Sequence, residues 1–431
     1  MSARITHYSI HDIRFPTSRT LDGSDAMNLA PDYSAAYVIL HVDHGPDGHG
    51  MTFTIGRGNE ICCSAIGAVS DLLVGRQIED LFTDMGATWK LVTGDSQLRW
   101  TGPEKGVIHL AAAAVINAIW DMYGKHAGQP VWQLIAGMSP ADMVSLIDWR
   151  YLSDALSPAE ALERLQERAP TKETRLSEMK ATGYPAYTTS AGWLGYSDEK
   201  IRTLMRAALN EGWTYFKMKV GTNIEDDCRR AKIIRDEIGP NRFLMMDANQ
   251  VWGVDEAIAN MDRLAEFDPW WIEEPTSPDD ILGHARIAQA VAPIKVATGE
   301  HCHNAVMFKQ LMQTGAIAIC QVDSCRLAGP NEILAVMLMA DKFNVPVCPH
   351  AGGVGLCELI QHMSLVDYIA VSGSLENRVL EYVDHLHGHF IDPVRTKAGY
   401  YIPPEMPGFS VEMKPHSIAE HTFPNGKIWL S

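Results

Sequence analysis

The sequence is poor in positive charge. Its 431 residues include 36 Lys and Arg against 53 Asp and Glu, which gives a formal net charge of −17 at pH 7. Nucleic acids and anionic membranes are bound by surfaces of clustered positive charge, so we expect neither as a partner. An acidic ligand could bind only where local lysines or a metal ion reverse the overall field.

The sequence also shows no disulfide framework, leader segment or membrane span. Its eight cysteines are scattered without a CxxC pair, which predicts reduced, mostly buried thiols. The N-terminal stretch MSARITHYSIHDIRF has no apolar core of the signal-peptide kind and reads as an alternating strand. The longest apolar run, residues 110–120, is interrupted by Asn117 and followed by Asp121. We therefore expect a soluble, cytoplasmic protein.

The first third of the chain mixes two patterns. Strand-like alternation, as in AAYVILHVD, gives way to helical runs such as residues 104–128, which favours an α+β unit over about residues 1–140. A polar insert rich in Glu and Arg follows, between about residues 150 and 183. Its SPAE segment is typical of a helix start, with serine as cap and proline in the first helical position. Covering the protein or contacting another subunit is the only role we assign to it.

From about residue 185 to 390 the sequence shows a regular repeat, in which short β-rich runs alternate with helical patterns. Such alternation predicts a parallel (β/α) barrel. The runs are AYTTS, YFKMKV, FLMMDAN, WWIEEP, IKVATGE, AICQVD, VPVCPH and RVLEYVD.

Ionisable residues recur near the ends of these runs, about one βα unit apart. In a (β/α) barrel the carboxyl ends of the strands meet at one mouth, where active sites are built. The side chains expected to converge there are Lys219, Asp247, Glu273, Glu300, Asp323, His350 and Glu381.

Three of these residues, Asp247, Glu273 and Glu300, offer carboxylate oxygens from three adjacent strand ends. Such a set suits Mg²⁺ and leaves positions for water and substrate, although a single carboxylate at a strand end is usually just solvated. Asn249 would share a face with Asp247 if the strand continued, either as a further ligand or as a hydrogen-bond donor.

A lysine pair is expected on one side of this site and an Asp/His pair on the other. Asp323 could fix the tautomer of His350, although PHAGG could equally hold a structural histidine. Lys217 and Lys219 share one strand face, where a neighbouring cation, a metal and burial would lower the pKa of Lys219 and yield a neutral amine base. The alternative is an edge strand with a solvated lysine face.

The ordered set FKMKVG, MDANQVW, WIEEP, ATGEH, QVD and CPHAGG resembles the mandelate racemase-like branch of the enolase superfamily. The stretch VINAIWDMYGKHAGQPVWQLIAG resembles the helix that ends the family's capping domain. The resemblance implies an α/β fold, a modified (β/α)7β TIM-type barrel with an α+β N-terminal capping domain completed by the C-terminal segment. The expected boundaries are 1–140 for the capping domain, 141–395 for the barrel and 396–431 for the returning segment.

Within that branch the resemblance is greatest to the L-fuconate dehydratases, carried by RFPTSRTLDGSDAMNLAPDYSAAYV, the 150–183 insert, TGEHCHN and LENRVLEYVDHLHGHF. It implies one Mg²⁺ per active site and the conversion of L-fuconate to 2-keto-3-deoxy-L-fuconate and water. Lys219 would remove the C2 proton, Lys217 and the metal would stabilise the ene-diolate, and His350, oriented by Asp323, would protonate the leaving C3 hydroxyl. A small-molecule acid sugar and a homo-oligomer are the partners expected. The implied substrate-binding residues are Gly23, Ser24, Asp25, Tyr33, Lys217, Asn249, Glu300 and Glu381.

Other readings stay open at this point. The chain could dehydrate another aldonate or aldarate, racemise or epimerise a 2-hydroxy acid, or be a catalytically silent metal-binding scaffold. The alternating His385, His387 and His389 favour a surface cluster over a second metal site, because no carboxylate or cysteine partner is evident. Trp100, Trp193 and Trp252 could line a sugar pocket, with Trp252 the best placed.

Overall fold

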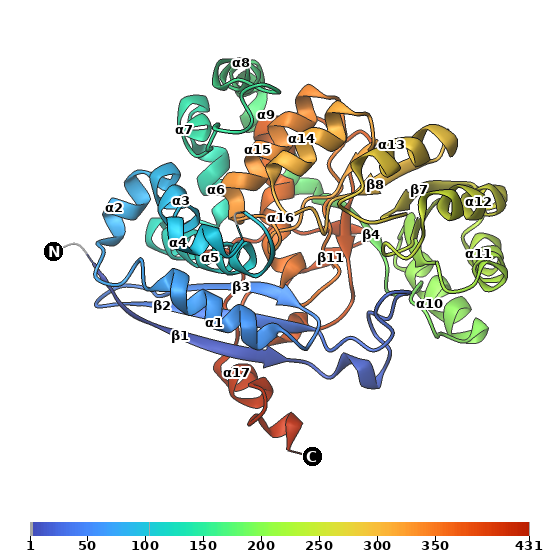
Figure 1. Ribbon diagram of the computed structural model, residues 1–431, viewed down its shortest axis with the longest axis horizontal. Coiled ribbons are helices and arrows are strands. Elements are labelled where there is room, and N and C mark those ends of the chain that lie inside the picture. The colour runs from blue at the N-terminus through green and yellow to red at the C-terminus, as the bar shows by residue number, and fades with distance from the viewer. Residues whose placement is uncertain (1–2, 103, 431) are drawn as a thin grey trace.

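The N-terminal part of the protein is an antiparallel sheet covered by helices. The computed structural model describes residues 3–102 and 104–430, so the outermost residues of the two predicted terminal segments, 1–2 and 431, lie outside the described part. The sheet has the strand order β1-β2-β3 (Figure 1). Its strands are β1 (Ile5–Arg14), β2 (Ser34–Val42) and β3 (Gly48–Thr54). The alternation seen in the sequence is thus confirmed as a half-buried sheet.

Helix α5 (Gly106–Ala127) packs directly on β3. Gly48 and Gly50 make this possible, because a Cβ at either position would collide with a backbone carbonyl of α5, that of Ala118 or Ala114. By length and composition α5 could cross a membrane, but 72% of its apolar stretch is buried inside the protein, as expected of a core helix. The other helices of this part are α1 (Asn59–Ser70), α2 (Ile78–Thr83), α3 (Met85–Thr93), α4 (Ser96–Trp100), α6 (Val131–Gly137) and α7 (Pro140–Ser145).

The rest of the chain forms the predicted parallel barrel. Strands β4 to β9 pair in sequence order, and the last barrel strand, β10, pairs in parallel with β4. The strands are β4 (Tyr184–Thr188), β5 (Tyr215–Lys219), β6 (Phe243–Asp247), β7 (Pro269–Glu273), β8 (Lys295–Thr298), β9 (Ile319–Cys320) and β10 (Leu380–Tyr382). The helices are α10 (Asp198–Asn210), α11 (Ile224–Ile238), α12 (Val254–Leu264), α13 (Ile281–Ala290), α14 (Ala305–Gln313), α15 (Gly329–Lys342) and α16 (Leu356–Val366).

The seventh strand position, VPVCPH, forms only an isolated bridge between Val347 and Cys320. Pro346 and Pro349 have no N–H to donate, so a regular ladder cannot extend through this segment. The backbone still follows the barrel, because the amide of His350 donates to the carbonyl of Val322 at 3.1 Å. His350 therefore reaches the same end of the barrel as the strand-borne residues.

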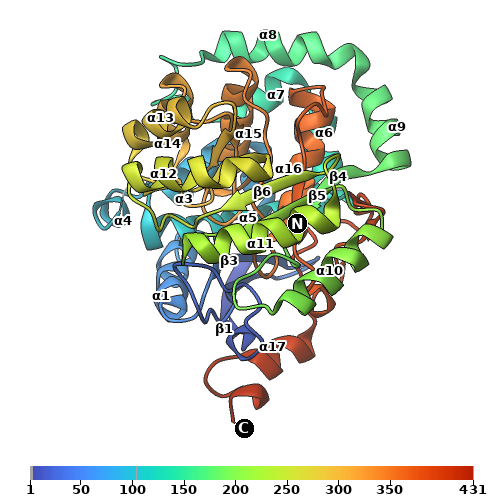
Figure 2. The same cartoon turned by 90° about the vertical axis from the view of Figure 1, so that its right-hand side faces the viewer.

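The polar insert is helical, as α8 (Pro158–Arg168) and α9 (Lys172–Thr182). Ser157 caps α8, Pro158 takes the first helical position, and Glu160 completes a capping box, which confirms the predicted helix start. In both views α8 lies at the opposite end of the molecule from α17 (Pro415–His421) (Figures 1 and 2).

The C-terminal segment begins on the barrel and ends on the capping sheet. Strand β12 (Tyr400–Tyr401) pairs with both β11 (Thr396–Lys397) and β4, whereas Thr422 just after α17 bridges Ile13 of β1. Short 3₁₀ or π turns occupy Thr17–Arg19, Ala169–Thr171, Ala265–Phe267, Asp367–Val371, His387–His389 and Lys427–Trp429.

Candidate active site

A cavity of about 330 Å³ lies where the carboxyl ends of the barrel strands face the capping domain. The barrel residues meet there as the repeating strand-end pattern predicts, and capping-domain residues join them as the family resemblance implies. From the barrel it is lined by Lys219, Asn249, Glu300, Asp323, His350 and Glu381, and from the capping domain by Gly23, Asp25, Tyr33 and Phe53.

Asp247, Glu273 and Glu300 form a buried carboxylate group. One oxygen from each lies within 4.8 Å of the others, close enough to share one cation. Glu300 Oε2 is buried without a hydrogen-bond partner among residues 3–102 and 104–430. Three buried carboxylates with an unsatisfied oxygen are a donor set that fits a hard divalent cation.

Lys217 and Lys219 point to the same side of β5, as predicted, while Phe216 and Met218 pack in the core on the other side. The edge-strand alternative is wrong, because β5 lies between β4 and β6 and both lysines are buried. Strand register sets their depths: Lys219 is level with Asp247, and Lys217 is level with Met245, one layer further into the barrel.

The two lysines differ in their nearest carboxylate partners, although Asp247 Oδ2 lies within 3.4 Å of both. Lys219 Nζ lies 2.6 Å from Asp247 Oδ2, whereas Lys217 Nζ lies 2.7 Å from Glu273 Oε1 and 2.8 Å from Glu381 Oε1. Burial and Lys217 lower the pKa of Lys219, as predicted, but Asp247 and other carboxylates outweigh them. The net pKa of Lys219 is raised in this arrangement, so a neutral amine requires that the Asp247 pair be broken.

His350 and Asp323 form the expected pair, with 2.7 Å between His350 Nδ1 and Asp323 Oδ2. The amides of Cys325 and Arg326 each donate to Asp323 Oδ1 at 2.7 Å, which holds the carboxylate in place. Although burial lowers the pKa of His350, Glu300 and Asp323 raise it to about 9. The ring lines the cavity, where the amide of Gly352 donates to Nε2 at 3.1 Å, so Nε2 acts as an acceptor in this arrangement.

Glu381 remains ionised at the cavity wall. Thr189 Oγ1 and the amide of Ala351 donate to it at 2.6 and 2.9 Å. Burial raises its pKa, but the ammonium of Lys217 opposes this and lowers the pKa to about 2.

The predicted capping loop folds over the cavity as an ordered turn. Asp25 Oδ1 accepts hydrogen bonds from the amides of Met27 and Asn28 at 2.8 and 2.6 Å. Gly23 has a φ of 82° and lies so close to the Tyr33 ring that a Cβ there would collide with it. Ser24 instead donates its hydroxyl to the carbonyl of Leu29 at 2.9 Å, so this hydroxyl is used within the loop.

Two sequence-based placements need correction. Asn249 lines the cavity, but β6 ends at Asp247 and Asn249 has a φ of 44°, so a left-handed turn places it there rather than strand alternation. Among the tryptophans, Trp193 lines the cavity, whereas Trp252 is buried in the core and Trp100 is exposed.

The predicted surface histidine cluster is also wrong. His385 is packed between the rings of Tyr33 and Trp193, His387 bonds Glu358 at 2.6 Å, and His389 bonds Ser417 at 3.1 Å. The three diverge because the chain leaves β10 and turns, so they do not share a strand face. Neither group of potential metal ligands within the described residues includes any of them.

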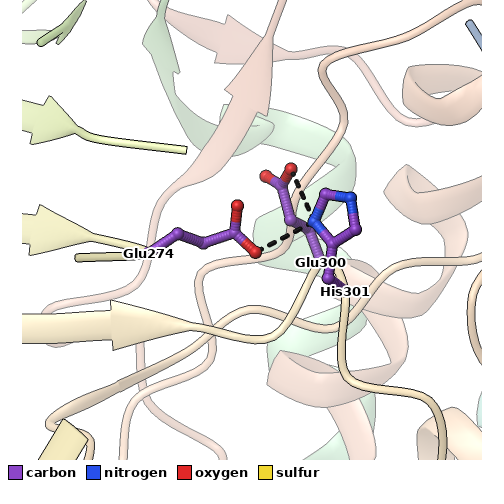
Figure 3. A group of neighbouring side chains, drawn as sticks. All are labelled: Glu274, Glu300 and His301. Carbon is purple, nitrogen blue, oxygen red and sulfur yellow. Dashed lines mark hydrogen bonds and ion pairs between the residues drawn. The ribbon is translucent and has the colours of Figure 1, made fainter. Parts of the chain in front are cut away.

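Sequence reasoning missed Glu274, His301 and Gln250. His301 Nδ1 lies 2.9 Å from Glu274 Oε1 and 3.3 Å from Glu300 Oε1 (Figure 3). Strand alternation would turn Glu274 away from Glu273, but its φ of 43° brings it back beside the site. The doubled acid of WIEEP and the histidine of ATGEH were the available signals.

Family models match most of the chain. The Mandelate racemase / muconate lactonizing enzyme N-terminal domain matches residues 20–136, and the Enolase C-terminal domain-like model matches residues 200–417.

Several full-length proteins are similar to this chain. Mitochondrial enolase superfamily member 1 of Homo sapiens is 54% identical, covering 99% of this chain and 97% of that one, and its crystal structure superposes with a TM-score of 0.98 over 99% and 98% of the two chains. L-galactonate dehydratase of Hypocrea jecorina is 55% identical over 98% and 95%. L-talarate dehydratase of Polaromonas sp. JS666, solved with Mg and L-glucarate, shares the fold at 21% identity, a TM-score of 0.71 and 96% coverage of each chain.

Proposed function

Because the chain belongs to the mandelate racemase-like branch of the enolase superfamily, we propose that it is a Mg²⁺-dependent acid-sugar dehydratase. The observation that carries this proposal is the convergence of Lys219 and the Asp323–His350 pair on one cavity beside three buried carboxylates. An amine and an oriented imidazole at one cavity provide the base and the acid that a β-elimination needs.

Asp247, Glu273 and Glu300 would hold the Mg²⁺, whose charge, when bound, stabilises the negative charge that develops on the substrate carboxylate. With Asp247 serving as a cation ligand, its pair with Lys219 would be weakened, and the Lys219 ammonium would release its proton more readily. The free amine takes the proton from C2.

His350 acts in the second half of the reaction. Asp323 pairs with Nδ1, so the protonated ring would donate from Nε2 to the C3 hydroxyl as the C3–O bond breaks, and the neutral ring would then accept at Nε2 from the Gly352 amide, 3.1 Å away. Water leaves, and the resulting enol tautomerises to a 2-keto-3-deoxy acid. Lys217 stays below the reacting atoms, where its charge neutralises Glu273 and Glu381.

We assign L-fuconate as the substrate. L-fuconate is the 6-deoxy form of L-galactonate, the substrate named for the 55% identical relative, and the two share their configuration at C2 and C3. The capping side of the cavity includes Met27, Pro31 and Phe53 among polar residues such as Asn28 and Arg57, and contact of a C6 methyl with the apolar three would favour it over a hydroxymethyl group.

The test is a panel of acid sugars incubated with the protein and Mg²⁺, with detection of 2-keto-3-deoxy products. We expect turnover of L-fuconate and of L-galactonate, with the higher kcat/KM for L-fuconate. Turnover of a different aldonate, with none of L-fuconate, would overturn the assignment of L-fuconate as the substrate. A change of configuration at C2 without loss of water would overturn the proposed dehydratase activity and favour a racemase.

A further inference from the structure

Glu274 and His301 form a second carboxylate–imidazole pair at the same cavity (Figure 3). Glu274 is fully buried, and its two oxygens are engaged by His301 Nδ1 at 2.9 Å and by Gln250 Nε2 at 2.8 Å. Gln250 Nε2 also lies 2.6 Å from His301 Nδ1. The imidazole is therefore held from its Nδ1 side by the buried Glu274, with Gln250 bound to the same carboxylate.

The other edge of the ring is available to a ligand. The His301 side chain is 37% exposed, and it lines the cavity together with Lys219 and Gln250. Its Nδ1 is directed at Glu274 and Glu300, whereas Nε2 has no partner among the residues that the structure describes. A polar atom held in this way at a cavity wall is a preformed hydrogen-bonding group.

We propose that His301 is a substrate-binding residue whose Nε2 hydrogen-bonds a hydroxyl of the acid sugar beyond C3, with Glu274 and Gln250 as its positioning residues. This inference rests on the proposed function. A hydroxyl can both donate and accept, so it is matched by Nε2 with or without a proton, whereas a carboxylate could only accept. The hydrogen bond would contribute to selection of the sugar, because a site built for a hydroxyl rejects an analogue that lacks it.

The competing explanation is that His301 acts only on the metal ligand Glu300, 3.3 Å away. Two variants separate these roles. In His301→Asn the side-chain amide can still meet Glu274 but does not reach the place of Nε2, whereas the longer side chain of His301→Gln does. His303→Asn is the matched control, since His303 lies outside the cavity lining and pairs with Asp279 at 3.4 Å.

The experiment measures kcat and KM for the acid sugar, and separately the Kd of Mg²⁺ by calorimetry without substrate. We expect His301→Asn to lower kcat/KM about 10- to 100-fold, mainly through KM, with the Mg²⁺ Kd within about twofold of wild type. His301→Gln should recover several-fold of this loss, and His303→Asn should behave as wild type. Retained Mg²⁺ binding also shows that the variant is folded.

Substrate analogues deoxygenated at C4 or C5 complete the test. The wild type should discriminate against one of them, and His301→Asn should lose that discrimination. Unchanged discrimination, or a loss of Mg²⁺ affinity that equals the loss of kcat/KM, would overturn the inference alone. If the wild type turns over no acid sugar, the proposed function fails and this inference fails with it.

Discussion

Lys217 is ion-paired with Glu273 in the barrel interior, with 2.7 Å between Nζ and Oε1. Neither side chain is exposed, and the same ammonium lies 2.8 Å from Glu381. One buried cation thus compensates two carboxylates beside the proposed metal site. Its position one layer below Lys219 gives the two lysines different nearest partners, although Asp247 Oδ2, the nearest partner of Lys219, also lies 3.4 Å from Lys217 Nζ.

Replacing Lys217 with methionine should destabilise the metal-free protein by about 3–5 kcal/mol, because it leaves buried carboxylates without a counter-charge. Urea denaturation followed by circular dichroism measures the change. Lys232→Met is the control, since that exposed lysine pairs with Asp236 on the surface and should contribute at most about 1 kcal/mol. Equal effects of the two substitutions would contradict the structural role given to Lys217.

Replacing Lys219 with alanine should reduce exchange of the substrate C2 proton with solvent by about 10²- to 10⁴-fold, because the amine is the proposed base. Proton NMR of L-fuconate in D₂O with Mg²⁺ follows this exchange directly. Exchange at the wild-type rate in the variant would place the base elsewhere.

His350→Asn should give a different pattern, since it removes the acid but leaves Lys219 in place. We expect C2 exchange to continue while formation of the 2-keto-3-deoxy acid falls by about 10²- to 10⁴-fold. Asp323→Asn should lower product formation as well, because the carboxylate that orients His350 Nδ1 is lost. Unimpaired elimination in His350→Asn would refute its acid role.

His362 should make the protein sensitive to acid. Burial lowers its pKa to about 3, and the amide of Trp132 donates to its Nδ1 at 3.2 Å, which requires a neutral ring. Below about pH 6.5 the unfolded chain binds more protons at this histidine than the folded protein does. The contribution of the neutral ring to the free energy of unfolding is therefore fully present above that pH and is lost as pH falls toward 3. We expect a loss of about 2 kcal/mol between pH 7 and 5.

The measurement is the free energy of unfolding at both pH values for the wild type and His362→Gln. The variant should lack this part of the pH dependence, whereas the exposed His416→Gln should keep it. A wild-type pH slope in His362→Gln would show that other groups cause the acid sensitivity.

The repeating unit explains why so much of the site could be predicted from sequence. Residues at the ends of parallel strands meet at one edge, so Lys219, Asp247 and Glu273 could be placed together from their spacing alone. Side-chain directions are harder to predict at residues where the chain leaves a strand. Glu274 and Asn249 have φ values of 43° and 44°, and a left-handed turn at a non-glycine residue has no clear signature in the sequence.

Long-range contacts explain the remaining errors. The sequence predicts His385 at the surface, yet Tyr33 from the capping domain and Trp193 from the β4–α10 loop pack on its ring. The raised pKa of Lys219 depends on a 2.6 Å contact with Asp247, and no spacing rule gives such a distance.

Local periodicity and strand-end chemistry, which are visible in neighbouring residues, were enough to determine the barrel, the face shared by the two lysines and the convergence of the strand-end residues on one cavity. Tertiary structure alone decided which carboxylate pairs with which lysine, how deep each charge lies and which imidazoles face the cavity. The reason is that burial and pairing energies depend on distances between segments far apart in the chain, which the order of residues does not specify.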